Sequence, residues 1–140
     1  MPFLVDGDNL LGTWPGRRRS DAERRELAME LGRMAHRWRR RVWIVFDGQA
    51  PPATSFGSGV RFAGPTRSAD DLILELLREQ TDRRGWIVVT SDRSLGDQCR
   101  YLESRIEKSD AFRKRLRNQP TDEKPERETD IDYWLDQFGE

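Results

Sequence analysis

The sequence predicts an α/β protein, a three-layer α/β/α sandwich around a central, mostly parallel sheet. Two observations predict this fold. Short, continuously apolar runs recur along the chain, as expected of strands that are covered on both faces. Segments in which apolar residues recur at helical spacing separate these runs, and strands that alternate with helices form parallel sheets. A chain of 140 residues is long enough for one domain with a sizeable core.

The first two strands are predicted at residues 3–6 and 42–46. Between them, a polar loop at 12–20 leads into a helix that Ser20 is suited to begin, because serine is a favoured N-cap residue. Apolar residues in this helix recur at helical spacing and form one stripe: Leu27, Leu31, Met34, Ala35 and Trp38.

The alternation of strands and helices continues after the second strand. The expected segments are a loop rich in Pro, Gly and Ser at 49–59, a third strand at 60–62, a helix at about 69–83, a fourth strand at 86–89, a short helix at 95–101, and a helix at 111–117 that Ser109 could cap. We therefore expect one domain over residues 1–118. Residues 119–140 are expected to form an acidic linker and a short C-terminal amphipathic helix, with Trp134 and Phe138, that packs on the domain.

Charge is unevenly distributed, although the formal net charge is zero. Up to Asn118 the chain has 23 Lys and Arg against 17 Asp and Glu, whereas eight acids and two bases follow it. Of the 25 basic residues, 22 are Arg. Arginine binds phosphate in a bidentate manner and stacks on flat rings, which favours a nucleic-acid partner. The alternative is that GC-rich coding favours Arg and that most of these side chains are only solvated.

We expect a cytoplasmic protein. The sequence shows no signal peptide and no apolar run long enough to span a membrane. Its single cysteine, Cys99, excludes an internal disulfide and is typical of a small buried residue in a reducing compartment.

Acidic residues follow three of the predicted strands. These are Asp6, Asp47 and Asp92, and the helix after the third strand begins with Asp70 and Asp71. The carboxyl ends of parallel strands share one edge of a sheet, where ligands bind in α/β proteins. Four separated segments therefore bring carboxylates to one place.

A group of carboxylates repels itself unless a cation is present. Oxygen ligands without His or Cys suit Mg²⁺ or Mn²⁺, and such ions activate water for in-line displacement at phosphorus. The only histidine, His36, lies opposite the apolar stripe of its helix, so a Ser–His or Cys–His nucleophile is not expected.

The acidic residues differ in their expected roles. On a helical projection, Asp70 lies at the edge of the buried face, whereas Asp71 points away and fits a capping box with Ser68. Asp8 is a less certain ligand, because the strand's alternation does not extend through the glycine before it. Asn9 could hydrogen-bond the turn or a water molecule.

The Thr90-Ser91-Asp92 stretch has two interpretations. Ser and Asp are favoured N-cap residues, so this stretch could begin the next helix. Its hydroxyl groups could instead orient a phosphate, with Arg93 contacting the substrate backbone.

Four stretches, in this order, resemble the motifs of NYN domains, specifically the YacP-like branch of the PIN-like nucleases. They are Val-Asp-Gly-Asp-Asn-Leu at 5–10, Val-Phe-Asp-Gly at 45–48, Ser-Ala-Asp-Asp-Leu-Ile at 68–73 and Val-Thr-Ser-Asp at 89–92. The resemblance covers nearly the whole chain. It implies a PIN-like, Rossmann-like fold, a divalent metal, and cleavage of phosphodiester bonds, usually in RNA.

The resemblance also implies roles for individual residues. Asp6, Asp70 and Asp92 match the metal-binding acids, Asn9 matches the polar partner of the first acid, and Asp47 matches a further acid near the site. Many members of this family have a bulky residue at the position of Asp8. Several NYN proteins are assigned RNA binding without demonstrated cleavage.

The sequence thus predicts a metal-dependent ribonuclease that cuts RNA internally, as a monomer or weak homodimer. The expected catalytic residues are Asp6, Asp70, Asp92, Asp47 and Asn9. The first three would hold Mg²⁺ or Mn²⁺, with Asp71 and Asp8 as further candidate ligands. The expected RNA contacts, to a single-stranded or structured substrate, are Arg17, Arg18, Arg19, Arg39, Arg40, Arg41, Arg67, Ser91 and Arg93.

Three other functions compete with this prediction. A non-catalytic RNA-binding module with a vestigial acidic site is the strongest alternative. The Asp6-x-Asp8 spacing also resembles haloacid-dehalogenase-type phosphatases, but the next residues are Asn-Leu instead of Gly-Thr, and all three lysines occur late in the chain. A protein-interaction module without a nucleic-acid partner has only the balanced net charge in its favour.

Overall fold

The computed structural model describes residues 1–52, 56, 57 and 59–118. Within this part of the chain, five parallel strands form one sheet in the order β3-β2-β1-β4-β5. The strands are β1 (Phe3–Asp6), β2 (Val42–Phe46), β3 (Val60–Phe62), β4 (Ile87–Val89) and β5 (Arg105–Glu107). The order reverses between β1 and β4, and the carboxyl edge beside such a reversal is where α/β sheets bind ligands.

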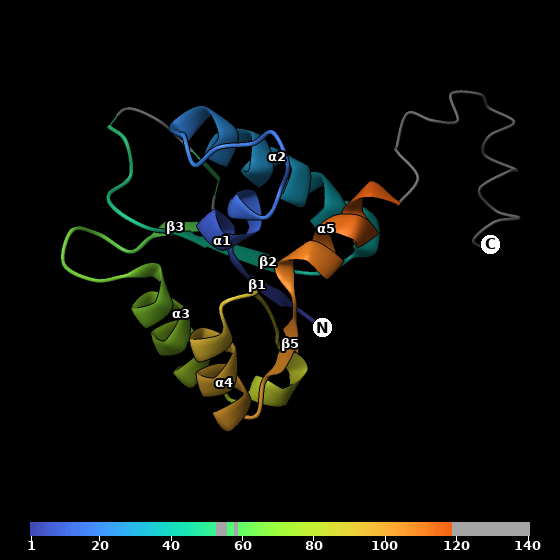
Figure 1. The fold of residues 1–140 in the computed structure, drawn as a ribbon. Coiled ribbons are helices and arrows are strands. Elements are labelled where there is room, and N and C mark those ends of the chain that lie inside the picture. Colours follow the sequence, from blue (N-terminus) through green and yellow to red (C-terminus); the bar gives the residue numbers. More distant parts are fainter. Residues whose placement is uncertain (53–55, 58, 119–140) are drawn as a thin grey trace, which may run out of the picture.

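Helices cover both faces of the sheet (Figure 1). They are α1 (Gly7–Gly12), α2 (Asp21–Trp38), α3 (Ala69–Arg78), α4 (Arg93–Tyr101) and α5 (Ser109–Arg117), with a short 3-10 helix, η1 (Arg83–Gly85). Helices α1, α2 and α5 lie on one face, and α3 and α4 lie on the other. The predicted three-layer sandwich is confirmed.

Alternate residues of β1 contribute to the two cores. Leu4 packs in the core that includes residues of α3 and α4, whereas Phe3 and Val5 pack in the core that includes residues of α1, α2 and α5. All three side chains are at most 1% exposed. A continuously apolar strand is therefore required here, because both faces of β1 are covered.

The first helix, α1, was not predicted. It begins directly after β1, so the chain turns from strand into helix at Gly7. A methyl group at this position would overlap the ring of Phe46, and it would lie 3.0 Å from Ile44 Cγ2. Glycine is therefore needed for the close approach of α1 to β2.

The predicted caps had different outcomes. Ser20 begins α2 as predicted, since its side chain accepts a hydrogen bond from the Glu23 backbone N–H at 3.1 Å. The prediction that Ser109 caps the last helix is wrong, because Lys108 occupies the N-cap position and makes no side-chain cap. The Ser109 hydroxyl instead donates to Asn9 Oδ1 at 2.7 Å.

Other element boundaries moved by a few residues. Helix α3 ends at Arg78, earlier than predicted, and η1 fills the gap before β4. The structure adds an edge strand, β5, that the sequence pattern did not locate. No helix of the described residues is long and apolar enough to cross a membrane. The predicted linker and amphipathic helix at 119–140 lie outside the described residues.

Candidate active site at the carboxyl edge of the sheet

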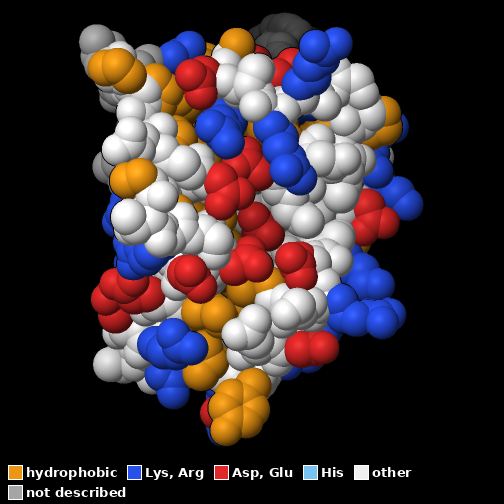
Figure 2. Space-filling view, turned by 60° about the vertical axis from the view of Figure 1, so that its left-hand side comes forward, with side chains coloured by type: hydrophobic (Ala, Val, Ile, Leu, Met, Phe, Trp, Pro, Cys, Tyr) orange, Lys and Arg blue, Asp and Glu red, His pale blue; other side chains and the backbone are white. Residues whose placement is uncertain are grey.

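Four acidic residues lie along the carboxyl edge of the sheet. Asp6 ends β1, Asp47 follows β2, Asp70 is in the first turn of α3, and Asp92 is the N-cap of α4. Figure 2 shows acidic side chains gathered in the middle of one face, with basic side chains above them. The parallel topology thus gathers the acids in the way the sequence predicted.

Asp6 is the most deeply buried of these acids, with 5% of its surface exposed. Its pKa is raised from 3.8 to about 7, chiefly because burial disfavours the charged form. The charges of Asp70, Asp47 and Asp8 raise this pKa further, whereas a hydrogen bond from Thr90 acts in the opposite direction. A buried carboxylate among other carboxylates would be stabilised by a cation.

Asp70 shares this electrostatic environment. Burial is again the largest cause of its raised pKa, followed by the charges of Asp92, Asp47 and Asp71. Its carboxylate makes no hydrogen bond or ion pair within the described part of the chain. Asp70 is therefore the acid with the most freedom to bind a ligand.

Thr90 links two of the acids. Its Oγ1 donates to Asp6 Oδ2 at 2.9 Å and accepts from the Asp92 backbone N–H at 3.1 Å. Thr90 is 1% exposed, so this link is shielded from water. The hydroxyl thereby holds the Asp6 carboxylate and the start of α4 in a fixed relation, a role that sequence reasoning did not assign to it.

Asp92 and Asp47 each accept, with one carboxylate oxygen, a hydrogen bond from a backbone N–H at the start of a helix. Asp92 Oδ1 accepts from the Leu95 backbone N–H at 3.1 Å, which confirms the cap interpretation. Asp47 Oδ1 accepts from the Ala69 backbone N–H at 2.8 Å at the start of α3. The second carboxylate oxygen of each has no hydrogen-bond partner among the described residues.

Asp71 is a cap, as the Ser68 spacing predicted. Ser68 Oγ accepts from the Asp71 backbone N–H at 3.1 Å, and Asp71 Oδ2 accepts from the Ser68 backbone N–H at 3.4 Å. The side chain is exposed at the start of α3. This geometry gives no support to Asp71 as a metal ligand.

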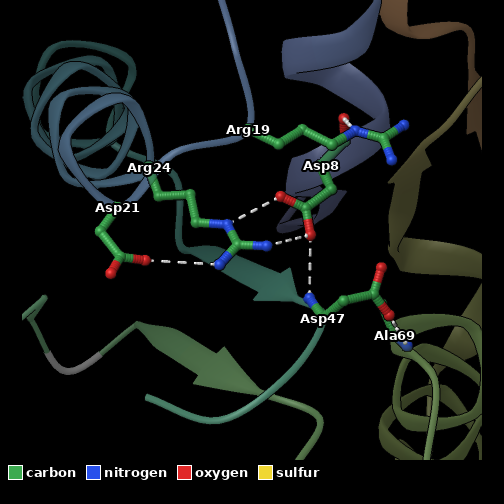
Figure 3. Close-up of polar contacts among 6 residues, drawn as sticks. All are labelled: Asp8, Arg19, Asp21, Arg24, Asp47 and Ala69. Atoms are coloured by element: carbon green, nitrogen blue, oxygen red, sulfur yellow. Dashed lines mark hydrogen bonds and ion pairs between the residues drawn. The ribbon is translucent and has the colours of Figure 1, made fainter. Parts of the chain in front are cut away.

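Asp8 is part of a buried ion pair (Figure 3). Arg24 donates from Nε to Asp8 Oδ1 and from Nη2 to Oδ2, both at 2.9 Å, and the Asp47 backbone N–H also donates to Oδ2, at 3.0 Å. Asp8 is only 3% exposed. Because both of its oxygens are engaged, the geometry does not support Asp8 as a metal ligand. The sequence pattern did not identify Arg24 as the partner of Asp8.

Asn9 ties together three segments that are distant in sequence. Its Oδ1 accepts from the Ser91 backbone N–H at 2.8 Å and from Ser109 Oγ at 2.7 Å. Ser91 Oγ in turn accepts from the Ser109 backbone N–H at 2.9 Å. The structure thus places Asn9 and Ser91 in a network that fixes the loop before α4.

The arginines predicted to contact RNA are divided between two edges of the sheet. Arg19 donates from Nε to the Asp8 carbonyl at 3.2 Å, Arg67 precedes α3, and Arg93 is the first residue of α4. All three therefore lie at the carboxyl edge of the sheet beside Asp6, Asp47, Asp70 and Asp92, which we call the acidic edge. The segment 39–41 precedes β2, so it lies at the opposite edge and cannot contact a phosphate bound at the acids.

The Arg17 side chain is engaged in contacts within the protein. It pairs with Glu23 and Glu30 at 2.8 and 2.9 Å, and its guanidinium lies 4.5 Å from the centre of the Trp14 ring. Arg18 is exposed, and Arg67 pairs with Glu75. Arg93 has no ion-pair partner in the described part of the chain.

The arrangement of the acids suits a divalent cation that keeps several water ligands better than one that is enclosed by protein ligands alone. Among the described residues, no three His, Cys, Asp or Glu side chains lie close enough together to hold a metal ion. Mg²⁺, however, usually keeps several waters and binds one or two carboxylates together with substrate phosphates. Asp6 and Asp70 could provide such a partial set of oxygen ligands, and burial, followed by the charges of neighbouring carboxylates, raises the pKa of both.

Comparisons with known proteins agree with this fold. The family model of the YacP-like NYN domain matches residues 3–132. The crystal structure of Rae1 (YacP) from Bacillus subtilis has a TM-score of 0.71 and 17% identity, over 99% of this chain and 82% of that one. Its W164L mutant has a TM-score of 0.71 and 22% identity, over 84% and 76%. No protein with curated annotation matches the sequence.

Proposed function

The chain belongs to the YacP-like NYN family, and on this premise we propose that it is a divalent-metal-dependent endoribonuclease. The observation that carries the proposal is the burial of Asp6 beside other carboxylates, which raises its pKa to about 7. Maintaining such a group destabilises the fold, and catalytic sites are where perturbed carboxylates are typically found. The substrate proposed is RNA, because the body of the chain is rich in arginine.

The proposed ion is Mg²⁺ or Mn²⁺. Asp6 and Asp70 would hold it, with water and substrate oxygens as its other ligands, and Asp92 would add negative charge beside Asp70. When bound, such an ion stabilises negative charge on a phosphate and lowers the pKa of water. Thr90 orients Asp6 through the 2.9 Å hydrogen bond to Oδ2. Asp47 adds negative charge near Asp6 and Asp70, which strengthens the attraction for a cation.

Positive side chains beside the acids would hold the RNA backbone. Arg19, Arg67 and Arg93 lie at the acidic edge, and Arg93 is exposed and directly follows Asp92. Contacts of this kind position a strand without reading its sequence. The affinity is therefore expected to fall steeply as the salt concentration rises.

A non-catalytic RNA-binding module remains the second candidate. The observation that favours it is the structural use of the acids, since Asp92 caps α4, Asp47 holds the start of α3, and Asp8 pairs with Arg24. In that case the acidic edge would stabilise helix ends and the chain would bind RNA without cutting it.

One experiment separates the two candidates. The full chain is incubated with single-stranded RNA in Mg²⁺ or Mn²⁺, and both cleavage and binding are measured. The endoribonuclease proposal predicts cleavage that is lost in EDTA and in Asp6→Asn or Asp92→Asn. The Asn at 92 can still accept from the Leu95 N–H, so the fold is expected to remain intact by circular dichroism.

Asp82→Asn is the matched control, because Asp82 is exposed and precedes β4 at the opposite edge of the sheet. It should cleave like the wild type. Full activity of Asp6→Asn, or of the wild type in EDTA, would overturn the proposal. Binding without cleavage under all ionic conditions would favour the non-catalytic module.

A further inference from the structure

A pocket opens beside the acidic edge, on the side of β4 and β5. It has a volume of about 470 Å³ and lies between the loop after β4, helix α4 and the end of β5. Thr90 and Asp92 line it, so it is continuous with the candidate active site. Its volume is within the range of about 300–1,000 Å³ that is typical of small-ligand sites.

The charge of the pocket contrasts with that of the neighbouring acids. Arg93 and Lys108 line it, and both are exposed and have no ion-pair partner among the described residues. Arg100 also lines the pocket and pairs with Asp97 at 3.2 Å. Apart from this pair, the lining contains two cationic side chains, Arg93 and Lys108, and one carboxylate, Asp92. A group that bears negative charge would therefore be stabilised there.

The two free cations lie on segments that are fixed relative to each other. Arg93 follows Ser91, whose N–H donates to Asn9 Oδ1. Lys108 precedes Ser109, which donates from its N–H to Ser91 Oγ and from its hydroxyl to Asn9 Oδ1. The walls of the pocket are thus held in place before a ligand arrives, which lowers the entropic cost of binding.

We propose that this pocket is a subsite for a backbone phosphate of the RNA strand, next to the phosphate at the acidic edge. The inference rests on the proposed RNA substrate. Successive phosphates of a strand are separated by one nucleotide, and the pocket directly adjoins Asp92. Arg93 and Lys108 contact the phosphate, and Ile106, which also lines the pocket, packs against the attached sugar.

The test is the salt dependence of RNA binding by the full chain. A short single-stranded RNA is titrated in EDTA, so that cleavage does not interfere, at several salt concentrations. Each phosphate contact contributes about 0.7 to the slope of log affinity against log salt for single strands. Arg93→Ala and Lys108→Ala are each expected to lower this slope by about that amount and to weaken binding roughly tenfold at low salt.

Arg105→Ala is the matched control. Arg105 begins β5, which Lys108 directly follows, so it lies at the other end of the same strand; it is exposed and has no ion-pair partner within the described residues. The Arg105→Ala substitution removes the same charge from the chain as Arg93→Ala does, but at a position away from the pocket. Its slope and affinity should match those of the wild type. Equal effects of the three variants would show a general charge effect and overturn the subsite.

A second pair of variants tests the pocket from another of its lining positions. Gly96 lines the pocket, and a Cβ there would come no closer than 3.7 Å to Arg100 Nη1 and 3.9 Å to Ile106 Cγ2. Gly96→Gln and Gly96→Glu have nearly the same shape and differ in charge. The Glu variant should bind RNA more weakly than the Gln variant, whereas equal affinities would contradict an anionic ligand in the pocket.

The failure of this inference can be distinguished from the failure of the proposed function. If the wild type cleaves RNA and the pocket variants keep its salt slope, the subsite is wrong and the nuclease stands. If the wild type never cleaves but the variants lose slope as expected, the pocket binds phosphate and the chain is a binding module.

Discussion

Thr90 Oγ1 lies 2.9 Å from Asp6 Oδ2 and donates a hydrogen bond to it. The two residues are 84 positions apart and join the carboxyl ends of β1 and β4, where the strand order reverses. The same hydroxyl accepts from the Asp92 N–H. One side chain therefore sets the relation between the buried Asp6 carboxylate and the helix that Asp92 caps.

Thr90→Val keeps the shape of this side chain and removes its hydroxyl. We expect it to destabilise the fold by about 1–3 kcal/mol, because buried polar groups lose their partner, and to lower cleavage. Thr90→Ser, which retains the hydroxyl, should come close to the wild type in both. Urea unfolding and cleavage rates measure the effects, and a Val variant as stable and active as the Ser variant would contradict them.

Asp6→Asn is expected to stabilise the metal-free protein. The pKa of Asp6 is about 7 in the folded protein, against an ordinary value of 3.8, so ionisation opposes folding increasingly as the pH rises from about 4 to about 7. Above that pH the full penalty applies, at most about 4 kcal/mol at 1.36 kcal/mol per pKa unit. In EDTA, Asp6→Asn should raise the midpoint of thermal unfolding above that of the wild type by more at pH 8 than at pH 5. A gain independent of pH would mean that Asp6 is not the cause.

Removing one member of the Asp8–Arg24 pair should be costly. Arg24→Met leaves the Asp8 carboxylate buried without its partner, and such losses amount to about 3–5 kcal/mol. Adding Asp8→Asn to this variant should restore part of the stability, because no buried charge remains. Urea unfolding of the two single variants and the double variant measures the coupling, and strictly additive effects would argue against the pair.

Two glycines give a matched comparison. Gly7→Ala should destabilise by about 1–3 kcal/mol, because the added methyl overlaps the ring of Phe46. Gly32→Ala lies in the exposed part of α2 and meets nothing within 4 Å, so it should stabilise by up to about 1 kcal/mol. Opposite shifts in the midpoint of thermal unfolding are expected. A tolerated Gly7→Ala would show that α1 can move away from β2.

The sequence pattern located most of the sheet and its acidic edge. Strands β1 and β2 were predictable because both their faces are buried and their residues are continuously apolar. In contrast, β5 contains only one apolar residue, Ile106, between charged neighbours, which is typical of an edge strand. Helix α1, at six residues, is too short to show a helical period.

Contacts between distant segments could not be predicted from local pattern. Asp8 and Arg24 are 16 residues apart in different helices, and Asn9 and Ser109 are 100 apart. Spacing alone favoured a helix cap for Ser109 and a turn contact for Asn9, and nothing in the local pattern pairs Asp8 with Arg24. Only the packing of α1 against α2 and α5 decides these contacts.

The most direct test of the central claim uses a circular single-stranded RNA, which has no ends for an exonuclease to attack. With Mg²⁺ or Mn²⁺, the full chain should open the circle to a linear product, and neither EDTA-treated protein nor Asp6→Asn should do so. A circle that stays intact while linear RNA is shortened, or one that is opened equally in EDTA, would contradict a metal-dependent endoribonuclease.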